Sequence, residues 1–541
     1  MMSSPLLLTG ILDRAAKIFP NVEIVSARLD GSRHRSNYLE VHKRARQLSA
    51  ALLDARIASG DRVATLMWNQ QEHLEAYFGV PAVGAVLHTL NLRLHPEEIA
   101  YIVNHAEDRF LIVDASLLEV FERFRPHVRL ERIIVVDHGC GQTAGGESYE
   151  SFLANAVDEP EYPEVAEDDA AAMCYTSGTT GKPKGVVYSH RALSLHSLGL
   201  ALPDQLHFSC HDSVLYAMSM FHANGWGFPY TATMTGGKQV LPGRNLQPEA
   251  LLDLLEGEQV TITGGVPTVW LAVLHALECH PGRWKLAPGM RVIVAGSAAP
   301  ESMFRRFDKF GVQVIQPWGM TETSPLATVC TLKPHMKNWS ADERYALRAK
   351  QGFPSPFIEV RALNDTQQTP WDSMTAGELE VRGPWVASGY YKLNESDRWT
   401  KDGWFRTGDV VTIDSEGYIK ITDRAKDLIK SGGEWISSVD LENAIVAHEA
   451  VKEAAVIAVP HPKWAERPLA VIVLKEGRQV GNAELCDFLS HRFAKWQLPD
   501  AFVFVDELPH TSTGKLLKSK LRQQFREWQW EQKISADEAT A

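Results

Sequence analysis

Short apolar runs alternate with helix-patterned stretches through most of the N-terminal part of the chain. Buried strands are predicted at Val63–Met67, Phe110–Val113 and Ile133–Val136, and the stretches beside them repeat apolar residues at helical spacing, as at Val41–Leu52, His73–Val80 and Pro96–Val103. Uninterrupted apolar strands separated by helices are typical of a parallel sheet with helices on its faces. We therefore expect an α/β fold, with ligand sites beyond the carboxyl ends of the strands.

The alternation resumes further along and then gives way to a different pattern. Three more strands, at Ala171–Tyr175, Val292–Ala295 and Val312–Ile315, each end in a turn with Gly or Pro. Beyond Gly408, the segments 411–413 and 418–421 predict a hairpin, followed by helices near 439–446 and 483–488 and strands at 456–459 and 470–473. We expect a large domain, residues 1–425, of helix-covered, mostly parallel sheets with a β-rich subdomain, and a small α+β domain, residues 426–541.

Length and composition exclude several kinds of protein. A chain of 541 residues is expected to form two or more domains, and a net charge of -12 argues against a nucleic-acid partner, although backbone N–H groups can still bind a nucleotide's phosphates. The six cysteines form no C-x-x-C pair, so we predict buried free thiols and no zinc site. The apolar patch Leu6–Leu8 resembles the start of an amphipathic helix, and no apolar stretch could span a bilayer. We expect a cytoplasmic protein with no integral membrane segment.

The strongest local signal follows the strand Ala171–Tyr175. Its glycines allow close backbone approach, its hydroxyls can donate hydrogen bonds and its lysines supply positive charge, which suits a polyphosphate. The string runs Thr176, Ser177, Gly178, Thr179, Thr180, Gly181, Lys182, Pro183, Lys184, Gly185. It is not a P-loop, because Gly178 and Gly181 are too close together. A plain surface loop is the alternative, and the ordered string favours phosphate binding over it.

Six motifs in order carry a resemblance to a known family. They are TSGTTGKPKG, GSAAP at 296–300, WGMTE at 318–322, RTGD at 406–409, DRAKDLIKSGGEWIS at 423–437 and STGK at 512–515. With them the chain resembles the adenylate-forming enzymes, which include acyl-CoA synthetases, aryl-CoA ligases, luciferases and peptide-synthetase adenylation domains. Within that family it is most similar to medium-chain fatty acyl-CoA and 3-methylthiopropionyl-CoA ligases.

The resemblance implies a nucleotide site on the large domain. Thr176–Gly181 and Lys184 would hold the phosphates, Thr321 and Glu322 would meet a phosphate oxygen and Mg²⁺ with Thr176 as a second metal contact, and Trp318 offers a flat face to a purine. Small residues beside the adenine and the backbone next to Trp318 complete the set: Gly296, Ser297, Ala298, Gly319 and Met320. A packed core Trp and tight turn packing are the structural alternatives for these residues.

Ribose contacts would come from two residues further along the chain. Asp409 is suited to accept hydrogen bonds from both ribose hydroxyls, and from local sequence alone a turn-capping role is equally good. Arg424 would contact ribose or phosphate, with a surface salt bridge as the alternative.

The resemblance also assigns the small domain a catalytic cation and a hinge. Lys515 would neutralise charge that develops as the carboxylate attacks the α-phosphate, although most lysines are solvated surface charges. Lys426 matches the hinge about which the small, mobile domain rotates between the two half-reactions. After rotation, a glycine-rich segment would line the coenzyme A tunnel, and a hairpin tip is its alternative: Gly432, Gly433, Glu434 and Trp435.

Two apolar segments predict the acyl site. His222 would lie near the carboxylate, and Gly225 and Trp226 belong to Phe221–Gly227, which resembles the acyl segment of fatty-acid and methylthiopropionate CoA ligases. A satisfied core His and a packed Trp are the structural alternatives for His222 and Trp226, and the resemblance favours function. Val266 and Pro267 would form another wall, although packing at a helix start fits them almost as well. Such walls favour a short- to medium-chain aliphatic acid, with a methylthio substituent allowed, over an amino acid that needs a buried carboxylate for its ammonium group.

The predicted function is an ATP-dependent acid:CoA ligase that uses ATP, Mg²⁺ and coenzyme A and releases AMP and pyrophosphate. A homodimer is expected from the resemblance alone. Two alternatives stay open at the level of sequence: an adenylating enzyme that passes its acyl group to a carrier protein or to oxygen, and a non-catalytic nucleotide-binding protein that kept the fold.

Overall fold

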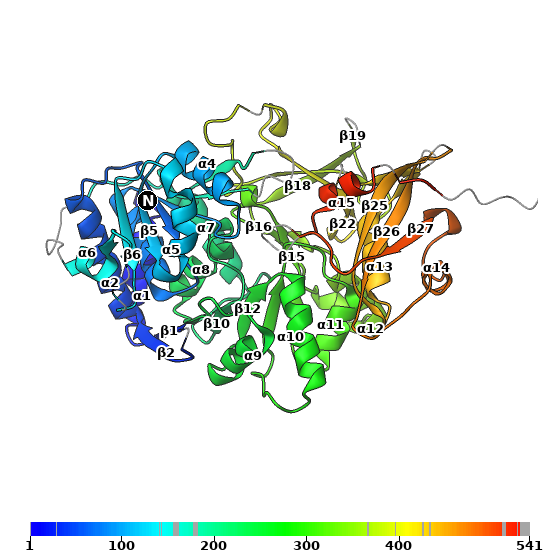
Figure 1. Cartoon of the computed structure of the whole chain (residues 1–541), viewed down its shortest axis with the longest axis horizontal. Helices are drawn as coiled ribbons and strands as arrows, with labels where there is room; N and C mark the ends of the chain where they lie inside the picture. Colours follow the sequence, from blue (N-terminus) through cyan, green and yellow to red (C-terminus); the bar gives the residue numbers. More distant parts are fainter. Residues whose placement is uncertain are drawn as a thin grey trace, which may run out of the picture. The chain divides into compact units, whose positions relative to one another are not determined.

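The chain divides into two compact units (Figure 1). The first comprises Met1–Thr407, Thr412–Lys420 and Ser512–Gly514, and the second Gly408–Val411, Ile421–Thr511 and Lys515–Ala541. The computed structural model describes residues 2–28, 30–139, 141, 143–154, 162–176, 182–364, 367–394, 396–424, 427–431, 434–461, 463–510, 516–526 and 528–530.

The first unit contains a seven-stranded sheet in the order β7-β6-β5-β3-β4-β8-β9. All its pairs are parallel except the hairpin of β8 and β9. The strands are β3 Arg62–Leu66, β4 Val86–Thr89, β5 Asp108–Asp114, β6 Arg132–Val136, β7 Glu147–Ser148, β8 Ala170–Tyr175 and β9 Gly185–Ser189. The helices along this part of the chain are α1 Leu8–Ile18, α2 Tyr38–Asp54, α3 Gln71–Gly79, α4 Pro96–Ala106, α5 Leu118–Phe124, α6 Tyr149–Ala154 and α7 His190–Ala201.

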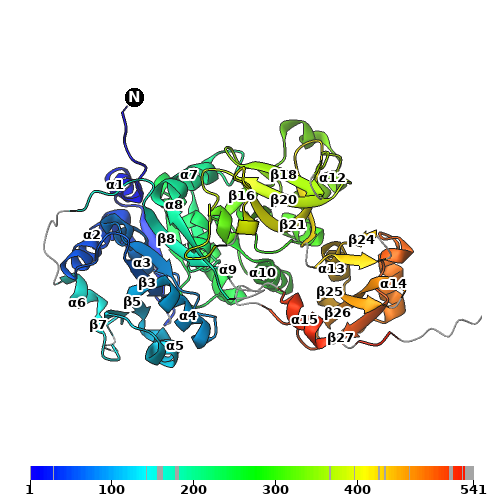
Figure 2. The same ribbon diagram turned by 90° about the horizontal axis from the view of Figure 1, so that it is seen from above.

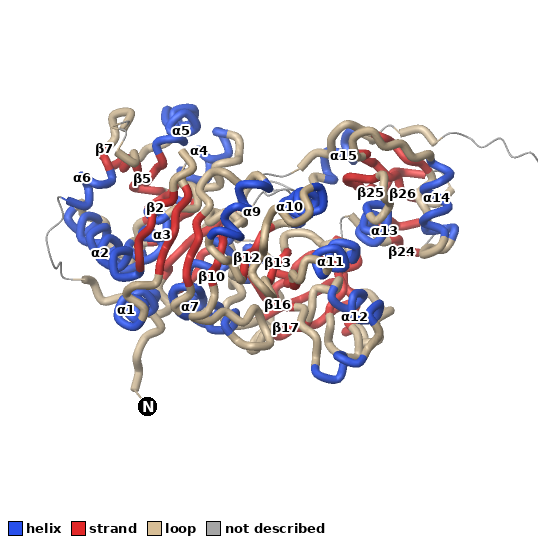
Figure 3. The backbone as a smooth tube through the Cα atoms, turned by 90° about the horizontal axis from the view of Figure 1, so that it is seen from below, coloured by secondary structure: helices blue, strands red, loops and turns tan. Residues whose placement is uncertain are grey.

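A second seven-stranded sheet has the order β14-β13-β12-β10-β11-β1-β2. It is parallel apart from the β1–β2 hairpin. Its strands are β1 Glu23–Ala27, β2 Arg33–Asn37, β10 Ser213–Tyr216, β11 Lys238–Leu241, β12 Ile262–Gly265, β13 Arg291–Val294 and β14 Gln313–Ile315. The helices here are α8 Phe228–Thr235, α9 Pro248–Gly257, α10 Pro267–Cys279 and α11 Glu301–Asp308. Figure 3 shows α9, α10 and α11 beside β10, β12 and β13. The three helices share one buried apolar cluster with β10 and β13.

Apolar burial explains why these segments fold as they do. In α2, Val41, Ala45, Leu48 and Leu52 face inward, and Asn37 caps the helix by accepting a hydrogen bond from the Glu40 amide. A single core cluster contains side chains of α1, α2, α7 and strands of both large sheets. Burying such side chains contributes about 1.5–3 kcal/mol each. Because this one cluster includes strands of both large sheets, the two sheets share a continuous core.

Two smaller sheets follow along the chain. One has the order β15-β16-β17, and the other β19-β18-β20-β21-β22; the neighbouring strands β18 and β20 are visible in Figure 2. Their strands are β15 Pro317–Gly319, β16 Leu326–Val329, β17 Phe353–Pro354, β18 Glu359–Asn364, β19 Gln367–Gln368, β20 Gly377–Arg382, β21 Phe405–Ile413 and β22 Ile419–Arg424, and helix α12 spans Ala341–Arg348. These sheets are the predicted β-rich part, and the division between the two units passes through β21.

The second unit is a small α+β domain. Its sheet has the order β24-β23-β26-β25, with β27 parallel to β26. The elements are β23 Ile429–Ser431, β24 Glu434–Ile436, α13 Ser438–Val446, β25 Val451–His461, β26 Ala465–Leu474, α14 Asn482–Ser490, β27 Ala501–Phe504 and α15 Lys518–Gln524. Leu441 of α13 and Leu485 of α14 lie in one buried cluster with Val456 of β25 and Ile472 of β26, so both helices cover the same face of the sheet.

The structure confirms the predicted α/β class and corrects one expectation. The predicted strands before β15 and the five helices predicted by range are present, and the 411–421 hairpin joins β21 to β22. The cysteines are not uniformly buried, because Cys210 and Cys279 are exposed while Cys174 and Cys330 are buried. Among the described residues, no helix combines the length and apolar character that crossing a membrane requires.

Candidate functional site

The ends of the predicted phosphate-binding string are fixed to each other. The Thr176 amide donates to the Lys184 carbonyl at 2.9 Å, and the Lys184 amide donates to the Thr176 hydroxyl at 3.2 Å. These contacts close the hairpin between β8 and β9 at the carboxyl end of a parallel strand. The structure therefore places Thr176 and Lys184, two of the predicted phosphate ligands, side by side.

The WGMTE segment folds as β15 followed by a short turn, Thr321–Thr323. A Cβ added to Gly319 would lie 1.9 Å from the Pro325 carbonyl oxygen, so only glycine fits there. Trp318 and Glu322 are buried. The Tyr188 hydroxyl, on β9, donates to the Thr321 carbonyl at 2.7 Å, which ties this segment to the strand that follows the phosphate-binding string.

One tyrosine brings the two motifs together. The Tyr390 hydroxyl donates to Glu322 Oε1 at 2.5 Å, and Lys184 Nζ lies 5.0 Å from the centre of the same ring. Burial, with the nearby Glu322 carboxylate, raises the pKa of Tyr390 well above its usual range, so its hydroxyl stays protonated and is the donor. A predicted phosphate ligand and a predicted metal ligand thus meet around Tyr390.

The residues predicted for the adenine site and the acyl wall lie at one edge of the second large sheet. Strands β10, β12, β13 and β14 are parallel neighbours, so the segments that follow them emerge at the same edge. Val266 and Pro267 begin α10 directly after β12. The segment Gly296–Ala298 follows β13 and has exposed residues, and Trp318 follows β14. The predicted adenine and acyl residues are therefore grouped.

The predicted acyl segment has an unusual backbone. Asn224, Gly225 and Trp226 have φ angles of 39°, 60° and 57°, in the left-handed region that L-residues other than glycine rarely occupy. Asn224 is 1% and Trp226 9% exposed. Left-handed backbone at three successive positions persists only where the surroundings hold it.

Three side chains hold this segment, and they come from β8, from α3 and from the turn between β3 and α3. Cys174 Sγ, on β8, accepts from the Asn224 amide at 3.2 Å and donates to Asn224 Oδ1 at 2.6 Å. Burial raises the pKa of Cys174 to about 11, so it remains a thiol donor. Asn69 donates to the Met218 carbonyl at 2.6 Å and accepts from the Met220 amide at 2.8 Å. The Tyr77 hydroxyl donates to the Met220 carbonyl. The carboxyl ends of the two sheets meet at this segment.

Further predicted residues belong to the second unit. Asp409 lies on β21 and is 4% exposed, Arg424 ends β22, and Glu434 and Trp435 lie on β24. Near the predicted hinge, Asp423 Oδ2 accepts from the Ser438 amide at 2.8 Å, and Arg522 donates to Asp427. These contacts fix the chain on both sides of the predicted hinge residue.

Several predicted residues lie outside the described residues. They are Ser177, Gly178, Thr179, Thr180, Gly181, Lys426, Gly432, Gly433 and Lys515. Their roles stay predictions. The structure does bring together Thr176, Lys184, Thr321 and Glu322, and it places His222, Gly225 and Trp226 beside β8.

Sequence reasoning missed the residues that connect these motifs. Tyr390 and Tyr188 link the motifs, and Asn69, Tyr77 and Cys174 support the acyl segment. Only Cys174 had a local signal, because it lies two residues before the predicted phosphate-binding string. The other four act on partners distant in sequence.

Comparisons with known proteins agree with this geometry. The family model "AMP-binding enzyme" matches residues 12–391, and "AMP-binding enzyme C-terminal domain" matches residues 440–515. The chain is 50% identical over 533 residues to a long-chain-fatty-acid–CoA ligase of Thermus thermophilus, covering 98% of this chain and 97% of that one. It is 45% identical over 536 residues to a 3-methylmercaptopropionyl-CoA ligase of Ruegeria pomeroyi, covering 97% and 98%. The ATP-bound MatB structure from Rhodopseudomonas palustris superposes with a TM-score of 0.79 at 26% identity, covering 96% and 99%.

Proposed function

The chain belongs to the AMP-binding enzyme family and is an acyl-CoA synthetase, and from this premise we propose that it activates a short- to medium-chain aliphatic carboxylate, with or without a methylthio substituent. The acid is converted to an acyl-adenylate, and the acyl group then passes to coenzyme A. The convergence of Lys184 and Glu322 on Tyr390 is the observation that carries the proposal, because it brings the proposed phosphate ligand close to the proposed metal ligand.

The residues present fit a magnesium ion bound together with a nucleotide. Mg²⁺ in nucleotide sites uses one or two carboxylates and takes its other ligands from phosphates and water. Glu322 supplies one buried carboxylate whose orientation is fixed by Tyr390 at Oε1. Glu322 would hold the ion with the Thr176 hydroxyl nearby, and the bound ion would offset phosphate charge.

The chain's own residues would perform the remaining tasks. Lys184 and the Thr176 end of the string would bind the phosphates, Trp318 and Gly296–Ala298 would hold the adenine, and Asp409 would accept from the ribose hydroxyls. Lys515 would stabilise the charge of the first step. For the second step, rotation about Lys426 would present Gly432–Trp435 to coenzyme A. The two domains in this scheme are residues 1–425 and 426–541.

The acyl pocket is the part of the proposal that concerns specificity. His222 would face the carboxylate, and Trp226, Val266 and Pro267 would bound the chain. The two curated relatives above carry names that differ in acid length, so a screen of linear, branched and sulfur-containing acids, followed by coenzyme A consumption, is the direct test of substrate. A homodimer also belongs to the proposal, and sedimentation equilibrium would test it.

The decisive experiment separates the two half-reactions. Lys515→Ala should reduce pyrophosphate release from ATP and acid by about 10²–10³-fold while sparing thioester formation from preformed acyl-adenylate. The control is Lys520→Ala, which removes an exposed lysine from the same unit and should leave both rates unchanged. Comparable losses in both half-reactions would contradict the role of Lys515. AMP release without a coenzyme A thioester would instead indicate another acyl acceptor, and equal AMP release by wild type and Lys515→Ala would indicate a non-catalytic protein.

A further inference from the structure

The left-handed backbone of the acyl segment extends over five successive residues. Besides Asn224, Gly225 and Trp226, Ala223 has a φ angle of 30° and Gly227 one of 75°. Residues other than glycine adopt this backbone at a cost in free energy, and they keep it only where the surrounding structure holds them. The conformation of the turn Ala223–Gly227 is therefore set by the groups that anchor it.

One thiol contacts this turn through both the backbone and the side chain of Asn224. Cys174 Sγ lies 3.2 Å from the Asn224 amide nitrogen and 2.6 Å from Asn224 Oδ1. The Thr89 hydroxyl, on the neighbouring strand β4, lies 3.3 Å from the same sulfur and donates to the Phe221 carbonyl at 3.4 Å. A thiol is a weak donor and a weak acceptor. All three side chains are buried, however, so water does not compete for these bonds.

Cys174 also connects the turn to the proposed phosphate site. It lies on β8, two residues before Thr176, which begins the predicted phosphate-binding string. Its partner Asn224 lies between His222 and Trp226, the residues proposed to face the carboxylate and the chain of the acid. A carboxylate that attacks a phosphate must be held accurately, since a displacement of about 1 Å can reduce the rate by about 100-fold. The thiol is placed to set the position of the acid's side of the site relative to the phosphate side.

We propose that Cys174 is a positioning residue for the carboxylic acid, because its thiol sets where the turn Ala223–Gly227 lies relative to β8. The thiol acts through Asn224 and does not itself touch the acid. This inference rests on the proposed function, since it takes Phe221–Gly227 to be the segment that binds the acid.

The nucleotide side of the site is held without this thiol. Thr176 and Lys184 bond to each other, and Glu322 accepts from Tyr390. Loss of the thiol leaves these contacts in place. The signature of the positioning role is therefore a higher KM for the acid with an unchanged KM for ATP. A merely structural role would give a different result, because a smaller amount of folded enzyme lowers the rate and changes neither KM.

The first test compares the loss of two buried thiols, with pyrophosphate release from ATP and hexanoate as the assay. Cys174→Ala should raise KM for hexanoate at least about fivefold and keep KM for ATP within about twofold of wild type. Cys330→Ala removes another buried thiol, which donates to the Leu347 carbonyl at 3.2 Å, and it should keep both KM values. A smaller rise for Cys174→Ala, an equal rise in KM for ATP, or the same shift in Cys330→Ala would overturn the proposal.

Two further variants test the hydrogen bonds and keep the proposal testable if Cys174→Ala folds poorly. Cys174→Ser retains a donor and an acceptor, so it should restore KM for hexanoate to within about twofold of wild type. Thr89→Val keeps the shape and removes the hydroxyl that donates to the Phe221 carbonyl, so it should raise KM for hexanoate at least about twofold and leave KM for ATP unchanged. A serine variant as impaired as Cys174→Ala, or a valine variant with the wild-type KM for hexanoate, would contradict the role of these bonds.

The wild-type enzyme separates this inference from the proposed function. If wild type releases no pyrophosphate with hexanoate, the proposed function fails and the role of Cys174 fails with it. If wild type is active and Cys174→Ala keeps both KM values, only the role of Cys174 is refuted.

Discussion

Removing the Tyr390 hydroxyl should reduce the catalytic rate while leaving the fold intact. Tyr390→Phe deletes the donor that holds Glu322 Oε1 at 2.5 Å and keeps the ring beside Lys184 and its edge-to-face contact with Trp399. Glu322 stays buried at 4% exposure and loses one charge-assisted hydrogen bond. Its carboxylate is then free to rotate away from the orientation that the proposed magnesium site needs.

The size of the effect follows from the type of bond. A hydrogen bond to a charged group contributes about 1.5–3 kcal/mol. If that energy orients Glu322 in the transition state, kcat/KM for ATP should fall by about 10- to 150-fold, since each 1.36 kcal/mol corresponds to a factor of ten. The free energy of unfolding should fall by no more than the same amount.

The assay is pyrophosphate release at varied ATP and Mg²⁺ concentrations. Tyr391→Phe is the matched control, because it removes a hydroxyl from the adjacent, half-buried residue, whose amide donates to Gly185, and leaves Glu322 untouched. We expect Tyr391→Phe to stay within twofold of wild type. If Tyr390→Phe kept wild-type kcat/KM while folding normally, the hydrogen bond would have no part in orienting Glu322.

Three further predictions concern stability, each measured by urea unfolding. Gly319→Ala should destabilise the first unit by about 1–3 kcal/mol through overpacking, because its Cβ would clash with the Pro325 carbonyl; no loss would mean that the backbone relaxes. Lys518→Met should destabilise the second unit by about 3–5 kcal/mol, since it removes the cation that lies 2.7 Å from the Glu442 carboxylate. Adding Glu442→Leu should restore most of that loss. A double variant as unstable as Lys518→Met would refute the pairing argument. Burial lowers the pKa of His73 from about 6.5 to about 4, so between these pH values only the unfolded chain binds the proton. The free energy of unfolding should therefore be highest above pH 6.5 and fall as the pH drops, by up to about 1.4 kcal/mol per pH unit. His73→Gln should show a shallower dependence on pH.

The sequence predicted strands with an apolar run and missed strands without one, for a physical reason. β3, β5 and β6 are buried on both faces, so their sequences are continuous apolar runs. β12, Ile262–Gly265, ends in two glycines and carries no such signal. A Cβ on Gly264 would come within 2.9 Å of the Met218 side chain, so this strand's composition is set by what packs against it.

The candidate site was predictable where it is local in sequence and not where it depends on tertiary contacts. Thr176, Lys184 and Glu322 lie within recognisable motifs. Tyr390 lies outside the six motifs, and its role appears only when β9 and the Thr321–Thr323 turn come together. The sequence predicted Phe221–Gly227 as an acyl segment, but it did not predict the left-handed turn there, because the side chains that hold the turn lie on α3, on β8 and between β3 and α3.

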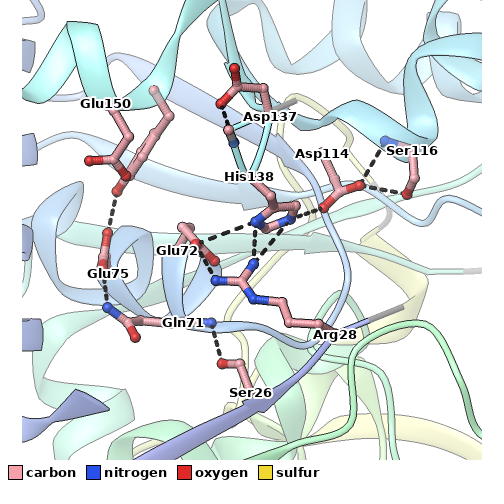
Figure 4. Close-up of polar contacts among 12 residues, drawn as sticks. Ser26, Arg28, Gln71, Glu72, Glu75, Asp114, Ser116, Asp137, His138 and Glu150 are labelled. Atoms are coloured by element: carbon pink, nitrogen blue, oxygen red, sulfur yellow. Dashed lines mark hydrogen bonds and ion pairs between the residues drawn. The ribbon is translucent and has the colours of Figure 1, made fainter. Parts of the chain in front are cut away.

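The short helix α3 supports the chain that leads into the predicted acyl segment. Every residue from Gln71 to Gly79 is buried, so the helix is packed on all sides and can shift only as a unit. In this helix Gln71 donates to the buried Glu75 carboxylate (Figure 4), and the Tyr77 hydroxyl donates to the Met220 carbonyl. Because Met220 directly precedes Phe221–Gly227, any change that displaces α3 must also displace the support of the left-handed turn at Asn224–Trp226.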